Sequence, residues 1–268
     1  MDKLFDTHAH LCDAAFDSDR GEVLRHARDK GVELIAEISC GPDEWRNALN
    51  FAASGGEKII ASVGFHPGNS SAFSPAALAE FKKMAALPQV RAVGEIGLDY
   101  YWPDNPAERQ LEMLEALVSI ANEVQKPVIL HCRSGKKGEN AYEDLLRVIG
   151  SGLCIGGDCR FKGILHCFSG AKEDAVKAVD MGFALGVNGT VTYPKNGQLR
   201  DIFKYIGKDS LVLETDCPYL PPQSIRGKRN DPSFLPEIAA GLAAALLLNY
   251  QETVSAVYQN SLEVFRLI

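Results

Sequence analysis

The chain has 268 residues with a formal net charge of −7, and 46% of its residues are hydrophobic. This length suits one large α/β domain, so we expect residues 1–268 to form a single domain. The acidic balance excludes a global attraction to nucleic acid, which leaves only local contacts with a polyanion. No apolar run approaches the roughly 18 residues of a membrane span, and the first residues do not resemble a signal peptide. We therefore expect a cytoplasmic protein without a membrane partner.

Eight short apolar runs predict β-strands, and helical periodicity fills most of the segments between them. The runs lie near residues 3–9, 32–39, 59–65, 90–97, 127–132, 162–168, 182–187 and 210–216. Alternating strands and helices are typical of a parallel sheet covered by helices. Eight such units predict a closed (β/α)8 TIM barrel. An open dinucleotide-binding sheet would need G-x-G-x-x-G after the first strand, and DTHAHLC lacks it.

The first predicted helix follows Ser18 or Asp19 as N-cap and stops at Gly31. Further helices are predicted at 42–56, 74–87, 105–126 and 172–182, from about 236, and at 252–265. Residues 136–160 stand out as an insertion with a glycine-rich end that delays the sixth strand. We expect this insertion to form a small hairpin beside the site.

Seven ionisable side chains end these apolar runs, and in a barrel the carboxyl ends of the strands form the active site. They are five of the six histidines and two acids: His8, His10, His66, His131, His166, Glu95 and Asp216. Imidazoles and carboxylates are costly to bury unpaired, and a divalent metal centre satisfies such a cluster. The pattern therefore predicts one shared metal site.

His8 and His10 stand two residues apart, so both imidazoles share one face of the first strand and can reach one cation. The motif H-x-H is weak by itself; its position at a strand end of a barrel is what favours ligation. Glu95 could instead be a structural glutamate, but its nearest cation, Arg91, lies toward the other end of the strand. We therefore expect Glu95 to bridge two metals.

His131 and His166 end neighbouring strands, and either one alone would more often be a core histidine. Their matching placement predicts ligation of a second metal. Asp216 is expected to bind the first metal and to act as general base, while Glu214 supports a ligand from behind. His66 is expected to contact a substrate phosphate; a third metal position and a plain loop histidine are the alternatives.

The segment after the last strand, SIRGKRNDP, carries a basic run. Such a run is usually only solvated, but here it follows the site in an acidic chain, so we expect Arg226 and Arg229 to grip substrate phosphate. Aromatic residues near the mouth could stack on bases of a single strand or form packed lids: Tyr100, Tyr101, Trp102 and Tyr219.

Seven cysteines with irregular spacing do not suggest a disulfide framework. Cys132, Cys167 and Cys217 each follow a candidate ligand, so strand alternation predicts that they face away from the site. Cys154 and Cys159 lack the second pair of a zinc site and indicate a glycine-rich turn.

Taken together, FDTHAHL, SVGFHP, AVGEIGLDYYW, ILHCR, ILHCFSG and ETDCPYLPPQSIRGKRNDP resemble the TatD family of metal-dependent hydrolases, in the amidohydrolase-like barrel superfamily. The resemblance spans nearly the whole chain. It implies the ligand set His8, His10, Glu95, His131, His166 and Asp216, which equals the set from the strand ends. Departures are Gly68 where many members have a second histidine after His66, Cys132 where serine is commoner, and the longer insertion.

The resemblance implies a deoxyribonuclease, often a 3′→5′ exonuclease, with two divalent metal ions such as Mg²⁺, Zn²⁺ or Mn²⁺. We expect the partner to be DNA with single-stranded ends, and the protein to be a monomer. An amidohydrolase or lactonase acting on a small molecule is the alternative, although several of those bridge their metals with a lysine that VRAVGEIG lacks. A metal-binding protein without turnover is a third possibility.

Overall fold

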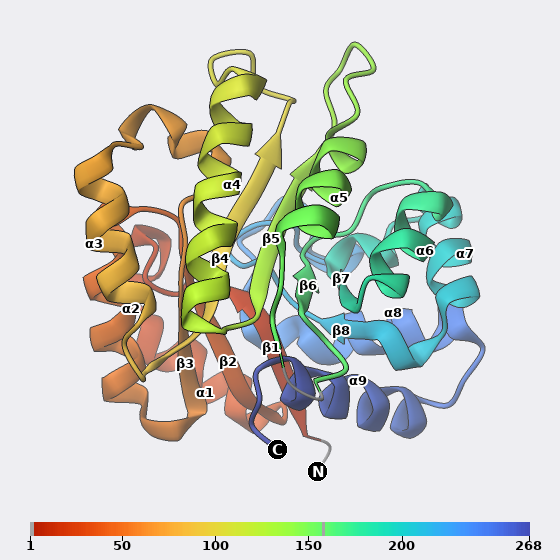
Figure 1. Ribbon diagram of the computed structural model, residues 1–268. Helices are drawn as coiled ribbons and strands as arrows, with labels where there is room; N and C mark the ends of the chain where they lie inside the picture. Colours follow the sequence, from red (N-terminus) through yellow and green to blue (C-terminus); the bar gives the residue numbers. More distant parts are fainter. Residues whose placement is uncertain (1–2, 157–158) are drawn as a thin grey trace.

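Figure 1 shows the computed structural model of the chain, which describes residues 3–156 and 159–268. In these residues all pairings between neighbouring strands are parallel, and the strand order follows the sequence from β1 to β8. The strands are β1 Leu4–Ala9, β2 Val32–Ser39, β3 Ile59–Val63, β4 Val90–Asp99, β5 Val128–Arg133, β6 Gly163–Leu165, β7 Phe183–Val187 and β8 Leu211–Leu213.

Helices alternate with the strands and cover the outside of the sheet (Figure 1). They are α1 Arg20–Asp29, α2 Pro42–Gly55, α3 Pro75–Ala85, α4 Ala107–Val124, α5 Ala141–Gly152, α6 Lys172–Asp180, α7 Gly197–Ile206, α8 Leu235–Leu246 and α9 Tyr250–Val264. The predicted (β/α)8 TIM barrel is confirmed.

The first and last strands close the barrel through the backbone of candidate site residues. The amide of Asp216 donates to the carbonyl of His8 at 2.8 Å, and the amide of His10 donates to the carbonyl of Cys217 at 2.9 Å. A parallel bridge pairs Ala9 with Cys217. Closure of the fold therefore sets the relative positions of the two ends of the site.

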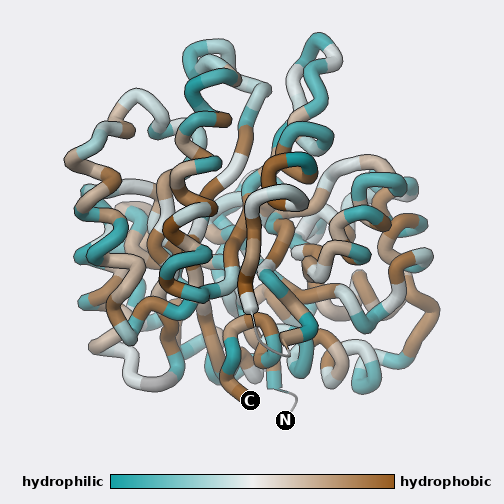
Figure 2. The backbone as a smooth tube through the Cα atoms, viewed as in Figure 1, coloured by the Kyte–Doolittle hydropathy of each residue, from teal (hydrophilic) through white to brown (hydrophobic). Residues whose placement is uncertain are grey.

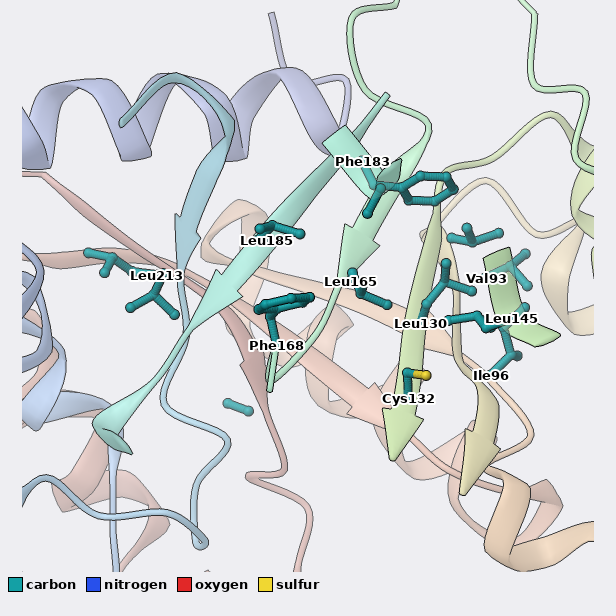
Figure 3. Close-up of a cluster of buried hydrophobic side chains, with 14 of the residues drawn as sticks. Val93, Ile96, Leu130, Cys132, Leu145, Leu165, Phe168, Phe183, Leu185 and Leu213 are labelled. Atoms are coloured by element: carbon teal, nitrogen blue, oxygen red, sulfur yellow. The ribbon is translucent and has the colours of Figure 1, made fainter. Parts of the chain in front are cut away.

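Two apolar layers flank the sheet. The larger one lies between strands and helices, and Figure 3 shows part of it, with Leu130 and Cys132 on β5 beside Val93 and Ile96 on β4. The smaller one takes residues from every strand, such as Phe5, and includes Phe265 after α9, whose ring stacks on Phe5 with centroids 5.1 Å apart. Figure 2 shows the hydrophobic strands within a largely hydrophilic outer surface. Apolar side chains fill the inside of the barrel, and polar side chains gather at the carboxyl ends of its strands.

Gly97 lets β4 approach β5 next to the candidate ligands. Its φ is +150°, and a Cβ added there would overlap the carbonyl oxygen of His131. We expect Gly97→Ala to lower the free energy of unfolding by more than about 2 kcal/mol, because both the backbone conformation and the close contact exclude a side chain. Urea unfolding measures this, with Gly21→Ala as control, since Gly21 lies in α1 with open space around it. Equal stability of both variants would contradict the prediction.

Two segments differ from the sequence predictions. The prediction of a hairpin in 136–160 is wrong for the described residues of this segment, because residues 141–152 form the helix α5. The side chain of Asn140 caps this helix by accepting from the amide of Glu143, and the apolar face of the helix is buried. Residues 157–158 lie outside the described part of the chain. The helix α7 was not predicted. Elsewhere the predicted strands and helices are present, with ends shifted by a few residues.

Among the described residues no single helix is long and apolar enough to cross a membrane. The helical segments Pro232–Leu246 and Tyr250–Val264 together have the length and composition of a membrane span, but the chain bends by 109° between them.

Candidate metal centre

A cavity of about 670 Å³ opens at the carboxyl ends of the strands. Five of the six candidate ligands line it, and His8 lies fully buried directly beneath. The six candidate ligands lie in five strands or in the residues soon after them: His8 in β1 and His10 after it, Glu95 in β4, His131 in β5, His166 after β6 and Asp216 after β8. Side chains distant in sequence thus meet at one place.

The first group of donors consists of His8, His10 and Asp216. The Nε2 atoms of the two imidazoles lie 3.2 Å apart, and Asp216 Oδ1 lies 3.4 Å from His10 Nε2 and 3.8 Å from His8 Nε2. His10 Nδ1 is 3.0 Å from the carbonyl oxygen of Ile38, so that carbonyl accepts the Nδ1 proton and, in the neutral ring, the lone pair of Nε2 is available to a cation. This group offers three donor atoms to one cation.

Glu95 lies between this group and the histidines of β5 and β6. One carboxylate oxygen, Oε2, is 3.4 Å from His8 Nε2. The other, Oε1, is 2.7 Å from His131 Nδ1 and 3.8 Å from His166 Nε2. Each oxygen thus faces a different set of imidazoles, which is the arrangement of a carboxylate that can bridge two cations.

The donor set fits divalent metal ions. Two imidazole nitrogens at 3.2 Å can share only one proton, while the His8 and His166 rings stack with centroids 3.4 Å apart and are fully or almost fully buried. A cation between these nitrogens and the carboxylates satisfies all of them together. Imidazole and carboxylate ligands suit zinc, manganese, iron and magnesium alike.

Two further acids hold the rings from behind. Glu214 Oε2 lies 3.0 Å from His166 Nδ1, as expected for a supporting residue, and its Oε1 accepts from the amide of Cys167 at 2.7 Å. Asp99 Oδ2 lies 3.3 Å from His131 Nε2. The sequence reasoning missed Asp99, although it stands four residues after Glu95 at the end of the same strand. Such acids fix ring orientation and make the ligand nitrogen a better donor.

His131 and His166 hold protons at neutral pH when no metal is bound. Burial lowers the pKa of His131 and His166, but the surrounding carboxylates outweigh it and raise the pKa of each to about 9. Burial would raise the pKa of Glu95, but nearby His166 and His8 hold it well below its usual value. The carboxylate is therefore ionised at neutral pH.

Metal binding is expected to release protons at neutral pH, because the metal displaces those held with a pKa of about 9 by His131 and His166. The apparent affinity should rise as pH rises from 6 toward 9. Titration calorimetry in buffers of different ionisation enthalpy measures the protons released. A pH-independent affinity between pH 6 and 9 would contradict this expectation.

His66 lies on the cavity wall, with its ring edge-on to His131 at a centroid distance of 4.6 Å. Its Nδ1 accepts from the amide of Gly68 at 3.0 Å, so the ring proton sits on Nε2. Burial lowers the pKa of His66 to about 4, which keeps the ring neutral. It can therefore offer a substrate one neutral hydrogen-bond donor. Its position with Asp99 and His131 also leaves the third metal position open as an alternative.

Neither Arg226 nor Arg229 lines the cavity. Arg229 forms a two-pronged ion pair with Asp19, at 2.9 and 2.6 Å, and its guanidinium carbon lies 4.6 Å from the ring centroid of Phe16. Arg226 lies over the ring of Tyr193 at 4.6 Å. The ion pair occupies Arg229, so its expected role as a phosphate contact is not supported; it holds the loop after β8 against the start of α1 instead.

Three cysteines were expected to face away from the site, and this prediction is wrong for Cys167. Cys132 and Cys217 are buried as expected, but Cys167 offers its sulfur within 4.8 Å of ligand atoms of His166 and Asp216. The reason is its φ of 48°, since β6 ends at Leu165 and strand alternation no longer applies. Cys154 and Cys159 are free and exposed.

The sequence reasoning also missed Cys40, which directly follows β2. Its sulfur lies 3.7 Å from Glu95 Oε2 and close to His10. This thiol therefore borders the metal centre.

Comparison with known proteins places the chain in a family. The family model for TatD related DNase matches residues 5–266. The chain belongs to the TatD family. This confirms the resemblance found in the strand-end motifs.

TatD relatives match over nearly the full length of the chain. The chain is 34% identical over 264 residues to the uncharacterized metal-dependent hydrolase YabD of Bacillus subtilis, covering 98% of this chain and 99% of that protein. It is 32% identical to the 3′-5′ ssDNA/RNA exonuclease TatD of Musicola paradisiaca, with 98% of each covered. The crystal structure of the TatD homologue YJJV from Escherichia coli matches with a TM-score of 0.88 at 30% identity, again over 98% of each chain.

Proposed function

We propose that this TatD-family hydrolase is a deoxyribonuclease that cleaves phosphodiester bonds at the 3′ ends of single strands with two divalent metal ions. The position of Glu95 between two groups of donors carries the proposal, because a pair of cations about 3.5–4 Å apart suits in-line displacement at phosphorus. The Musicola paradisiaca relative is named as an exonuclease acting on single-stranded DNA and RNA from the 3′ end, which supports the substrate and the polarity.

The residues divide into two sets of ligands. His8, His10 and Asp216 would hold one ion; His131 and His166 would hold the other, with Glu95 shared. Bound ions supply Lewis-acid polarisation of the phosphoryl group and offset its negative charge. The protein fixes the ring orientations through Glu214 and Asp99.

Asp216 is suited to accept the proton of the attacking water. Burial would raise its pKa, but His166 and His10 hold it below its usual value, so the carboxylate is ionised at neutral pH. It lies at the wall of the cavity, where a substrate would be placed. His66 can donate from Nε2 to a phosphate oxygen without adding charge.

Hydrolysis of a small molecule by an amidohydrolase-type or lactonase-type reaction is the second candidate. Solved structures that share this barrel include a yeast amidohydrolase at 18% identity, a likeness that extends to the fold alone. The described strand β4, VRAVGEIGLD, contains no lysine that could serve as a carbamylated bridge. We therefore rank this candidate below the nuclease.

The deciding experiment is cleavage of end-labelled single- and double-stranded DNA by the purified protein with Mg²⁺, Mn²⁺ or Zn²⁺ in turn. We expect single-strand shortening from the 3′ end, abolished by EDTA and restored by one of these metals. Turnover of lactones or amides without any DNA cleavage would favour the second candidate, and no turnover with any metal would favour a binding protein. We also propose a monomer located in the cytoplasm; gel filtration of the metal-loaded protein tests the first point.

A further inference from the structure

Beside β4 and β5, two aromatic rings and two cations that the metal centre does not use lie in the cavity wall or next to it. We call them the rim cluster: Tyr101, Trp102, Arg133 and Lys136. Trp102 and Arg133 line the same cavity as Glu95. Figure 1 shows the two loops that carry most of the cluster, one between β4 and α4 and one between β5 and α5, rising at the top of the view. The cluster therefore borders the route from the metal centre to solvent.

Tyr101 organises the two cations. The guanidinium carbon of Arg133 lies 3.6 Å from the Tyr101 ring centroid, and the Nζ of Lys136 lies 3.8 Å from it. Arg133 also acts on the carboxylate of Asp99, whose pKa its charge helps to lower, while contact with the ring orients both cations without neutralising their charge. Two ordered positive charges thus stand beside the cavity of an acidic protein.

Trp102 is the exposed member of the cluster. Its ring meets Tyr101 edge-on, with centroids 4.9 Å apart and an angle of 83°, and the residue remains 52% exposed. A large indole is costly to leave in water when it could be buried. An exposed indole next to two cations has the chemistry of a site that takes an unpaired base and its phosphates.

The charges on the rest of the cavity wall indicate the direction in which a bound strand would leave the metal centre. Asp13, Glu37 and Glu44 line the cavity from the side of β1 and β2. Asp99 lines the cavity on the other side, but Arg133 acts on it electrostatically and Lys136 adds a second positive charge there. A polyanion is therefore repelled more by the wall of β1 and β2 than by the side of the rim cluster. The charges alone therefore favour one path for a strand that leaves the metal centre.

We propose that the rim cluster binds the single strand adjacent to the bond that is cleaved. One base stacks on the exposed ring of Trp102, and Arg133 and Lys136 contact backbone phosphates. The inference rests on the proposed nuclease function and deepens it, because bases in a duplex are already stacked on each other and offer no free face to Trp102.

Binding of a fluorescein-labelled dT oligonucleotide with phosphorothioate linkages, which keep the charge and slow hydrolysis, tests the cluster in the metal-loaded protein. Trp102→Ala should weaken binding about 5- to 100-fold, as expected for the loss of one stacked base. Tyr205→Ala is the matched control: Tyr205 is 62% exposed beneath the Nζ of Lys172 but does not line the cavity. Unchanged binding by Trp102→Ala, or an equal loss in the control, would overturn the proposal.

Two further measurements separate stacking from phosphate contact. The other tryptophan, Trp45, is fully buried, so quenching of intrinsic fluorescence by the oligonucleotide should report on Trp102 and disappear in Trp102→Ala. Arg133→Ala and Lys136→Ala should each reduce the slope of log affinity against log salt by about 0.7. Unaltered slopes in both variants would overturn the phosphate contacts.

Hydrolysis of a small phosphodiester, which has no strand to bind, tells a failure of the strand site apart from a failure of the proposed nuclease function. Trp102→Ala should raise KM for the oligonucleotide by a much larger factor than KM for bis(4-nitrophenyl) phosphate, because the small ester has no adjacent strand to hold. Loss of both activities would show that Trp102 acts on the metal centre and would overturn the strand site. Trp102-dependent binding by a protein that hydrolyses neither ester would support the strand site and reject the proposed nuclease function.

Discussion

Replacing Glu95 with alanine is expected to reduce hydrolysis by about 10³-fold or more, equivalent to about 4 kcal/mol of transition-state stabilisation. One oxygen of this carboxylate faces His8 and the other faces His131 and His166, so its loss separates the donors of one cation from those of the other. Bound metal, measured by atomic emission after gel filtration, should fall together with the activity. The protein should stay folded, because Glu95 faces the polar cavity rather than an apolar layer.

The matched control is Glu44→Gln. Glu44 lines the same cavity but accepts from the amide of Cys40 at 2.6 Å and is not part of the donor groups. We expect it to keep most of the metal and the activity. Full activity in Glu95→Ala would reject the two-metal arrangement, and equal losses in both variants would show that general charge in the cavity is responsible.

The positions of the candidate ligands followed from the sequence because two simple periodicities determine them. Strand alternation places His8 and His10 on one face, and a parallel barrel gathers every strand end at the same rim. The backbone bonds that join His8 with Asp216 and His10 with Cys217 then bring the first and last strands together. No knowledge of loop structure is needed for this step.

Residues outside the strands were less predictable. Arg229 was expected at the substrate because it follows the site in sequence, but Asp19, 210 residues away, pairs with it. Cys167 turns toward the site because its backbone leaves the strand conformation at a φ of 48°. Such long-range partners and backbone reversals have no periodic signature. In contrast, Asp99 was detectable, since it ends β4 and belongs to the same strand as Glu95.

Removing the proposed proton acceptor with Asp216→Asn should reduce kcat for the phosphodiester about 10²- to 10⁴-fold, the usual contribution of general base catalysis. Asparagine keeps one oxygen and the size of the side chain, so metal content should fall less than in Glu95→Ala. Since the pKa of Asp216 lies below its usual value, the native enzyme should keep its activity down to acidic pH as far as this group is concerned. The variant should instead gain rate with rising pH, because hydroxide replaces the missing base.

Asp13→Asn is the control for that experiment. Asp13 also lines the cavity, but its carboxylate caps a short helix by accepting from the amide of Ala15 at 2.7 Å and lies outside the donor groups. We expect the native pH profile in this variant, with at most a small loss of stability. If Asp216→Asn keeps the native pH profile and loses activity only in proportion to its metal, Asp216 serves as a ligand and another group accepts the proton. His66, whose ring proton sits on Nε2, cannot take that role without changing the hydrogen bond from Gly68 that fixes its orientation.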